Sequence, residues 1–272
     1  MRFLTILSVI TVIALSGCSS FSKVQKSNDY EVKLKAADAY YAKQQYHYAQ
    51  QLYEELFPLF KGDPRFEDLY YKYAYCAYHQ RDWMNAENLF KSFVEVFPTS
   101  KSAGEMDYMR AYCYYKQSPK YELDQTNTTK TIGLMQAFIN THPGSEKNKE
   151  AAEIIEKCRL KLEMKEWKSA QLYYDVGHFR AASIAFATLM DNYPDSPKSD
   201  LYKLMVVKST YEYANLSIES KQVERYQQVI NECNDFADRF SESNLNKQVE
   251  EYLKLSQNNI KTIKDEQAKT AA

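Results

Sequence analysis

Hydrophobic residues recur along most of the chain at intervals of three and four, the spacing that places them on one face of an α-helix. Short polar segments separate these amphipathic stretches. Glycine and proline, which interrupt helices, number only 6 and 7 in 272 residues. The pattern predicts an all-α protein.

Three of these stretches end alike, with a ring-bearing residue, a proline and a closing serine. The endings are Phe97-Pro98-Thr99-Ser100, His142-Pro143-Gly144-Ser145 and Tyr193-Pro194-Asp195-Ser196. Small and large residues stand at matching distances before two of these prolines. They are Ala74, Trp83, Ala86 and Phe90 before Pro98, and Ala170, Phe179, Ala182 and Phe186 before Pro194. The spacing resembles the tetratricopeptide repeat of about 34 residues, in which two antiparallel helices interlock.

The repeat predicts a right-handed superhelix of about five tetratricopeptide-like helix pairs with a concave groove, closed by a C-terminal capping helix. The expected pairs cover residues 30–63, 67–100, 104–145, 163–196 and 200–243, and the terminal helix covers 245–263. An insertion at 118–127 interrupts the third pair. The tail at 264–272 is expected to be disordered.

The N-terminus has the pattern of an exported lipoprotein. An apolar run at positions 3–15 follows Arg2, is shorter than the roughly 20 residues that span a bilayer, and ends in Leu-Ser-Gly-Cys. That tetrad resembles a lipobox, which implies a signal peptide of residues 1–17, cleavage before Cys18 and lipid on its thiol. We expect residues 18–28 to be a flexible tether. Ser19, in place of aspartate, favours the outer membrane by resemblance to bacterial sorting rules.

Charge and cysteine content narrow the chemistry. Removing residues 1–17 takes away one basic side chain, which leaves 34 basic and 36 acidic ones, interspersed. No basic stripe exists for nucleic acid. The other cysteines are far apart, without zinc-ligand spacing, and are expected to be buried apolar residues, with a disulfide left open as the alternative. They are Cys76, Cys113, Cys158 and Cys233.

The motifs of common enzyme classes are missing from the sequence. It contains no His-Glu-x-x-His, no glycine-rich phosphate loop and no nucleophile elbow, and its four histidines do not cluster. We therefore expect a protein without catalytic activity, cofactor or metal.

The 24 tyrosines provide the candidate binding surface. In tetratricopeptide-like stacks the first helix of each pair lines the concave groove. The groove candidates are Tyr71, Tyr75, Tyr78, Tyr108, Tyr112 and Tyr115. Aromatic faces and hydroxyl groups together suit an extended peptide. The alternative is that these rings pack one helix pair against the next.

A lipobox followed by five such repeats, with a distinctive third repeat, resembles the BamD family. In that repeat Ala111-Tyr112-Cys113-Tyr114-Tyr115 leads into Ser118-Pro119 and Leu123-Asp124-Gln125. The resemblance implies a non-enzymatic subunit of the machinery that assembles β-barrel proteins, anchored in the periplasmic leaflet of the outer membrane. It implies that C-terminal repeats, here residues 173–240, bind a POTRA domain of a BamA-like barrel protein. It also implies that the N-terminal groove receives the C-terminal targeting strand of unfolded clients.

Two further inferences concern origin and alternatives. The tyrosine richness and the lack of an acidic run after Cys18 are similar to a Bacteroidetes-type member that faces the periplasm. The alternative is a tetratricopeptide lipoprotein that serves as a scaffold for another envelope process, such as cell-wall synthesis. A nutrient-binding lipoprotein is a third class, but this chain has no room for large inserted loops.

Overall fold

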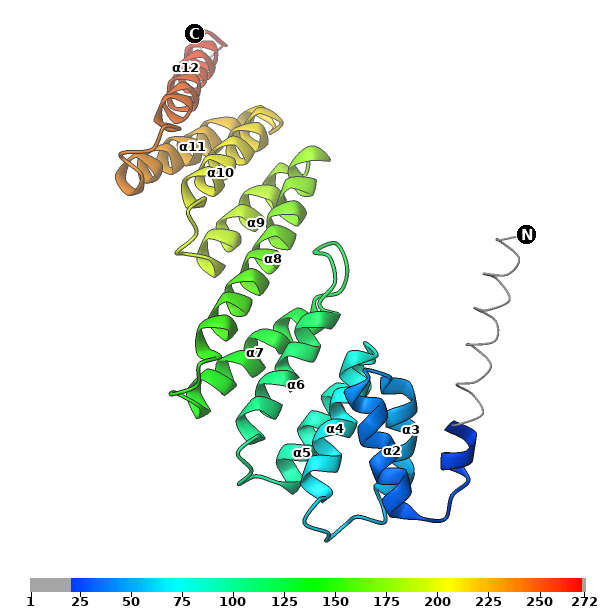
Figure 1. Cartoon of the computed structure of the whole chain (residues 1–272). Coiled ribbons are helices and arrows are strands. Elements are labelled where there is room, and N and C mark those ends of the chain that lie inside the picture. Colours follow the sequence, from blue (N-terminus) through cyan, green and yellow to red (C-terminus); the bar gives the residue numbers. More distant parts are fainter. Residues whose placement is uncertain (1–20, 271–272) are drawn as a thin grey trace, which may run out of the picture. The chain divides into compact units, whose positions relative to one another are not determined.

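The computed structural model describes residues 21–270, which form helices and connecting loops without a β-strand (Figure 1). Five helix pairs followed by one long helix confirm the predicted all-α fold class. The helices are α2 (Tyr30–Ala42), α3 (Tyr46–Leu56), α4 (Phe66–His79), α5 (Trp83–Val96), α6 (Ala103–Gln117), α7 (Thr126–Thr141), α8 (Asn148–Asp175), α9 (Phe179–Asn192), α10 (Ser199–Asn215), α11 (Glu219–Arg239) and α12 (Asn246–Thr270). Within this range no helix is long and apolar enough to cross a membrane.

The chain divides into two compact units, residues 1–158 and 159–272, and α8 contributes to both. The first unit contains α2 to α7. Its core is built on the alanine and aromatic positions of the repeat: Ala74 and Ala86 are fully buried, and Phe90 and Phe93 pack beside them. Small side chains let the helices approach closely, and the phenylalanines fill the remaining space.

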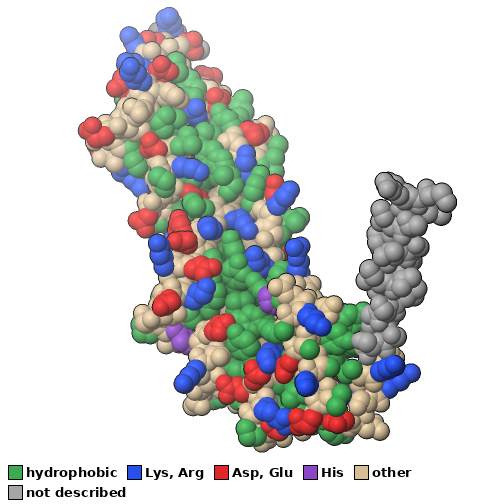
Figure 2. All heavy atoms as spheres, in the orientation of Figure 1, with side chains coloured by type: hydrophobic (Ala, Val, Ile, Leu, Met, Phe, Trp, Pro, Cys, Tyr) green, Lys and Arg blue, Asp and Glu red, His purple; other side chains and the backbone are tan. Residues whose placement is uncertain are grey.

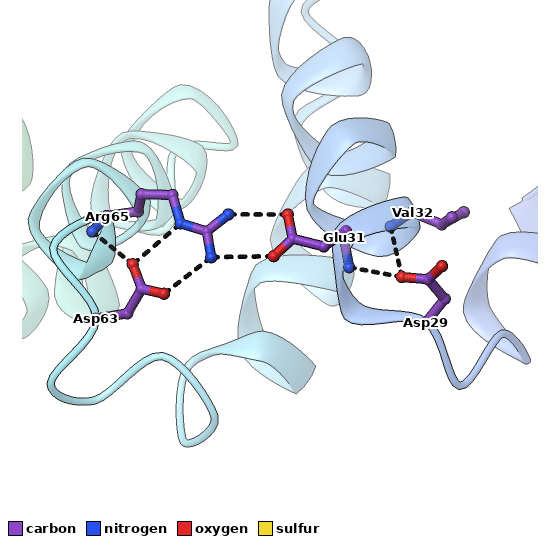
Figure 3. Close-up of polar contacts among 5 residues, drawn as sticks. All are labelled: Asp29, Glu31, Val32, Asp63 and Arg65. Atoms are coloured by element: carbon purple, nitrogen blue, oxygen red, sulfur yellow. Dashed lines mark hydrogen bonds and ion pairs between the residues drawn. The ribbon is translucent and has the colours of Figure 1, made fainter.

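Polar contacts fix the first two helix pairs to each other. The hydroxyl of Tyr53 on α3 donates to Asp38 on α2 at 2.7 Å, and the same carboxylate accepts from Lys72 on α4 at 2.9 Å. Near the N-terminal end of α2, Arg65 binds both Glu31 and Asp63 (Figure 3). These charged contacts join α2 to the loop that leads into α4.

The turns inside three helix pairs use the same backbone device. A residue with a positive φ follows the first helix: Gln44 (58°), Arg81 (62°) and Gly177 (80°). Only glycine adopts this left-handed region without a steric cost, so Gly177 fits its turn better than the other two. The repeated geometry explains why the pairs have similar shapes despite different sequences.

The insertion in the third pair is an ordered loop between α6 and α7. Gln125 is buried, and its amide nitrogen donates to the backbone carbonyls of Lys120 at 2.8 Å and Leu123 at 3.0 Å. Its carbonyl oxygen accepts from the hydroxyl of Thr128 at 2.7 Å. One buried amide thus holds the loop and the start of α7 together, because its hydrogen-bonding groups must be satisfied inside the protein.

The second unit contains the later part of α8 and α9 to α12. Ala170, Ala182 and Phe186 form its core with Trp167, whose ring lies 5.2 Å from that of Phe186. A buried carboxylate, Glu163, accepts hydrogen bonds from the hydroxyls of Ser196 and Tyr202, both at 2.5 Å. The nearly buried Lys203 pairs with Glu232 at 2.5 Å and with Asp235.

Two expectations about the ends of the chain need correction. Residues 21–25, expected to belong to a flexible tether, are helical, and Phe21 is buried. The reason is that its ring packs against the rings of Tyr40 and Tyr48 in the first helix pair. At the other end, α12 continues through Thr270 beyond the expected limit at Ile263. Residues 264–270 contain neither glycine nor proline, so nothing stops the helix.

The cysteines of the described residues are buried, as predicted, and no disulfide joins them. Burial raises the pKa of Cys76 and of Cys113 to about 12, because the apolar surroundings disfavour the thiolate. The same effect raises the pKa of Cys233 to about 12. These thiols are packing groups of the core. Cys18, the predicted lipidation site, lies outside the described residues.

Candidate functional site

The candidate tyrosines stand on the first helices of the second and third pairs. On α4 they occupy positions 71, 75 and 78, and on α6 positions 108, 112 and 115. Intervals of four and three residues bring side chains onto one helical face. Figure 2 shows hydrophobic side chains, a class that includes tyrosine, gathered on the first unit.

The rings form a continuous series across the two helices. On α4 the ring centroids of Tyr71 and Tyr75 are 4.7 Å apart, and those of Tyr75 and Tyr78 are 6.0 Å apart. Tyr78 then reaches Tyr112 of α6 at 6.4 Å, and Tyr112 lies 5.8 Å from Tyr115. We call these five half-buried residues the tyrosine surface. Their edge-on and tilted contacts are the geometries that aromatic quadrupoles favour.

Tyr108 does not belong to this surface, which corrects the sequence-based prediction. Its side chain is only 2% exposed and packs on Phe138 of α7, with the ring centroids 5.5 Å apart. It also lies 5.8 Å from Tyr112. The cause is the neighbouring helix α7, whose aromatic side chain covers the start of α6. Tyr108 is therefore the support beneath Tyr112, and packing between helices accounts for its role.

A carboxylate, which the sequence analysis did not single out, stands at one end of the tyrosine surface. The hydroxyls of Tyr71 and Tyr75 both donate to Oε1 of Glu105, the former at 3.1 Å. Burial, and after it the nearby Glu105 carboxylate, raises the pKa of Tyr71 above its usual value. Glu105 thus orients two of the five rings. Its spacing of 34 residues from Tyr71, one repeat length, was the signal available in the sequence.

A lysine stands at the other end of the same surface. The Nζ of Lys116 lies 4.9 Å from the centroid of the Tyr112 ring, within the range of a cation–π contact. Both Glu105 and Lys116 are exposed. They are eleven residues apart on α6, which corresponds to about 16 Å along the helix axis. The surface therefore has an acidic end and a basic end.

His79 joins the tyrosine surface to the first helix pair. Its imidazole stacks on the ring of Tyr46 of α3, with centroids 4.2 Å apart, and lies 5.9 Å from Tyr75. Desolvation by burial lowers the pKa of His79 below its usual value, which favours the neutral ring. A neutral imidazole extends the aromatic series by one ring. Among the described residues, no group of three or more His, Cys, Asp or Glu side chains is placed to hold a metal ion.

The second unit exposes large apolar side chains near the ends of its helices. Leu172 and Val176, on α8 and just after it, are 61% and 55% exposed, and Leu216 and Ile218, between α10 and α11, are 74% and 70% exposed. Single exposed apolar residues are ordinary, but Val176, Leu216 and Ile218 lie in the region predicted to bind a partner protein, and Leu172 directly precedes it. They are the candidate contact residues of this unit.

Paired helices of repeated geometry, with a tyrosine-lined face, define an all-α repeat protein of the tetratricopeptide type. The chain belongs to the YfiO family of outer membrane lipoproteins, whose family model matches residues 26–222. This match confirms the resemblance to the BamD family, and the Bacteroidetes-type origin stays a prediction.

Among curated proteins, none matches the chain in sequence. One similar solved structure is the TPR2AB-domain:pHSP90-complex of yeast Sti1, at 12% identity and a TM-score of 0.38, with 84% of this chain and 98% of that chain covered.

Proposed function

We propose that the protein is a lipid-anchored, non-enzymatic scaffold of the machinery that assembles β-barrel proteins in the outer membrane. Its anchor is lipid on Cys18, in the periplasmic leaflet. The first unit binds the C-terminal segment of unfolded outer-membrane proteins, and the second unit binds the POTRA region of a BamA-like barrel protein. Membership of an outer membrane lipoprotein family supports the anchor and the compartment. The observation that carries client binding is the unbroken tyrosine surface on α4 and α6.

The size and polarity of the tyrosine surface suit the end of an extended chain. A length of about 16 Å accommodates about five residues of a strand at 3.3 Å each. Tyrosine rings cover apolar side chains, and their hydroxyls satisfy peptide groups. Lys116 at one end fits a terminal carboxylate, whereas Glu105 at the other end repels one. The preferred guest is therefore a short apolar segment with a free C-terminus.

A peptide-binding measurement tests this part of the proposal. Replacing Tyr112 with alanine is expected to weaken binding of a fluorescent ten-residue peptide ending in phenylalanine about tenfold or more, because it removes the ring that links the α4 and α6 parts of the surface. Fluorescence anisotropy gives the dissociation constant. Tyr30→Ala, at an exposed tyrosine of α2 outside the surface, is the matched control and should leave binding unchanged.

Lys116→Glu tests the polarity of the same surface. This variant should weaken binding of the free-acid peptide more than binding of the same peptide with an amidated C-terminus. Equal losses for the two peptides would contradict the assigned orientation. Unchanged binding by Tyr112→Ala would show that the tyrosine surface does not bind the client peptide.

A pull-down from the native membrane tests the assembly role. The tagged full-length protein, purified in mild detergent, should retain a barrel protein with tandem POTRA domains at near-equal amount. The double variant Leu216→Asp, Ile218→Asp should lose most of it, because charges cannot be buried at an apolar contact without a large penalty. Met84→Asp, at a similarly exposed apolar residue of the first unit, is the control. Recovery of cell-wall enzymes in place of the barrel protein would favour the alternative scaffold role.

A further inference from the structure

The residues just before α2 are packed on the first helix pair. Phe21 is buried, with its ring centroid 4.6 Å from that of Tyr48 on α3 and 5.8 Å from that of Tyr40 on α2. Val24 packs against the same core cluster. This short helical segment therefore covers the aromatic end of the first unit, as a capping element does in a repeat protein.

Hydrogen bonds fix the rest of the segment. The amide nitrogen of Gln25 donates to Glu55 of α3 at 3.2 Å, and the hydroxyl oxygen of Ser27 accepts from the backbone nitrogen of Asp29 at 3.1 Å. Asp29 in turn caps α2 by accepting from the backbone nitrogens of Glu31 and Val32 (Figure 3). These contacts fix the position of the segment between Phe21 and α2 on the first helix pair.

The length of chain before Phe21 limits how far the first unit can stand from a lipid anchor. Only two residues separate Cys18 from Phe21. Three residue steps span at most about 11 Å even when fully extended. If Cys18 carries lipid, as the proposed function requires, Phe21 lies within that distance of the lipidated residue, and the part of the first helix pair around Tyr40 and Tyr48, on which its ring packs, lies close to the bilayer surface.

The charge of the segment suits a phospholipid surface. Residues 21–28 contain Lys23 and Lys26 and no acidic residue, and both lysines are exposed. Basic side chains close to a membrane are attracted to anionic headgroups, and the attraction falls off within a Debye length. The limit of about 11 Å applies to Phe21 with the preceding chain fully extended, and Lys23 and Lys26 follow Phe21 by two and five residues. With the preceding chain less than fully extended, the long lysine side chains reach the headgroup region.

We propose that residues 21–28 form a rigid membrane collar, which holds the first helix pair against the bilayer with Lys23 and Lys26 at the headgroups of anionic phospholipids. The inference rests on lipidation of Cys18 and goes beyond it, because lipidation alone is compatible with a long flexible tether. The collar fixes the height of the tyrosine surface above the membrane, within the first unit.

A spin-label experiment on the full lipidated chain tests the collar. Asn28→Cys introduces one exposed thiol that can be labelled selectively, because Cys76, Cys113, Cys158 and Cys233 are buried. The protein is placed in vesicles of phosphatidylethanolamine and phosphatidylglycerol that contain a nickel-chelating lipid. The nickel should relax the nitroxide strongly.

The matched control carries twelve Gly and Ser residues inserted between positions 20 and 21. Such a linker has a root-mean-square length of about 20 Å, so relaxation should fall at least threefold. Lys23→Glu with Lys26→Glu should lower relaxation in these vesicles and leave it unchanged in vesicles of phosphatidylcholine with the same nickel-chelating lipid.

The outcomes separate the collar from the anchor. Equal relaxation in the native and linker-inserted chains, with lipid on the N-terminal peptide confirmed by mass spectrometry, would overturn the collar and leave the anchor standing. An N-terminal peptide without lipid would overturn both the anchor and the collar. Loss of relaxation in the linker-inserted chain, together with a loss in the double lysine variant that occurs only with anionic lipid, would establish the collar.

Discussion

Phe186→Ala is expected to lower the free energy of unfolding of the second unit by about 3–5 kcal/mol. Phe186 lies on α9, is fully buried and packs between Ala170, Ala182 and Trp167. Truncation removes apolar contacts and leaves a cavity, because the flanking alanines are too small to fill it. A loss of this size is a large part of the roughly 5–15 kcal/mol that stabilises a typical domain.

The two tryptophans allow the effect to be assigned to one unit. Trp83 belongs to the first unit and Trp167 to the second, and Trp167 lies 5.2 Å from Phe186. In a Trp83→Phe background, urea unfolding followed by fluorescence therefore reports on the second unit. Ile184→Ala is the matched control, since Ile184 stands on the same helix but is 59% exposed and should change stability by less than about 0.5 kcal/mol. Similar losses in the two variants would contradict the assigned core.

Periodicity in the sequence was enough to predict the helix pairs and much of their core. The alanines placed by the repeat, including Ala74 and Ala182, are fully buried, as are the paired phenylalanines Phe90 and Phe186. Small and large residues at fixed distances encode which helix faces meet, because only those combinations allow close packing. In three of the pairs, the proline that follows marks where the second helix ends.

Exposure at the tyrosine surface could not be read from the same pattern. Tyr108 and Tyr112 share a helical face, yet the former is 2% exposed and the latter is half-buried. The difference comes from Phe138 on the next helix, which covers one end of α6 and leaves the other open. Helical spacing gives the direction of a side chain but not the position of the neighbouring helix.

The same limit explains the segment before α2. A polar stretch with a single phenylalanine resembles a tether in composition. Its structure depends on whether an uncovered aromatic site exists elsewhere, and Tyr40 with Tyr48 provides one for Phe21. Likewise the role of Glu105 could not be predicted from the sequence, where it is one of many acidic residues. It is seen only in the structure, where the hydroxyls of two tyrosines donate to its carboxylate.

Alkaline pH is expected to unfold the first unit between about pH 10 and pH 12. Its interior contains tyrosines whose hydroxyls must stay protonated. Burial, and after it the hydrogen bond to Asp38, raises the pKa of Tyr53 far above its usual value, and burial likewise raises that of Tyr108. For Tyr73 burial raises the pKa to about 12. Tyr53 is fully buried and Tyr108 nearly so, so the shifts of these two residues are not screened by solvent.

The sign of the effect follows from proton binding in the two states. An unfolded tyrosine loses its proton near pH 10, whereas the folded protein keeps it up to a higher pH. Above pH 10 the unfolded state therefore binds fewer protons, and stability falls as the pH rises. Each such tyrosine, with a folded pKa well above 11, lowers the free energy of unfolding at pH 11 by about 1.4 kcal/mol. Tyr53 and Tyr108 together remove about 3 kcal/mol, and the stability is fully present below pH 10.

A pH titration followed by two signals checks this expectation. Helicity from far-ultraviolet circular dichroism should fall in one cooperative step, and the tyrosinate absorbance should rise in the same step. Tyr53→Phe should be less stable than the native chain at neutral pH, since it loses the 2.7 Å bond to Asp38, but its stability should fall less between pH 10 and pH 11. Tyr30→Phe, at an exposed tyrosine, should follow the native curve. A gradual rise of tyrosinate absorbance near pH 10 with helicity intact would show that these hydroxyls ionise in the folded state.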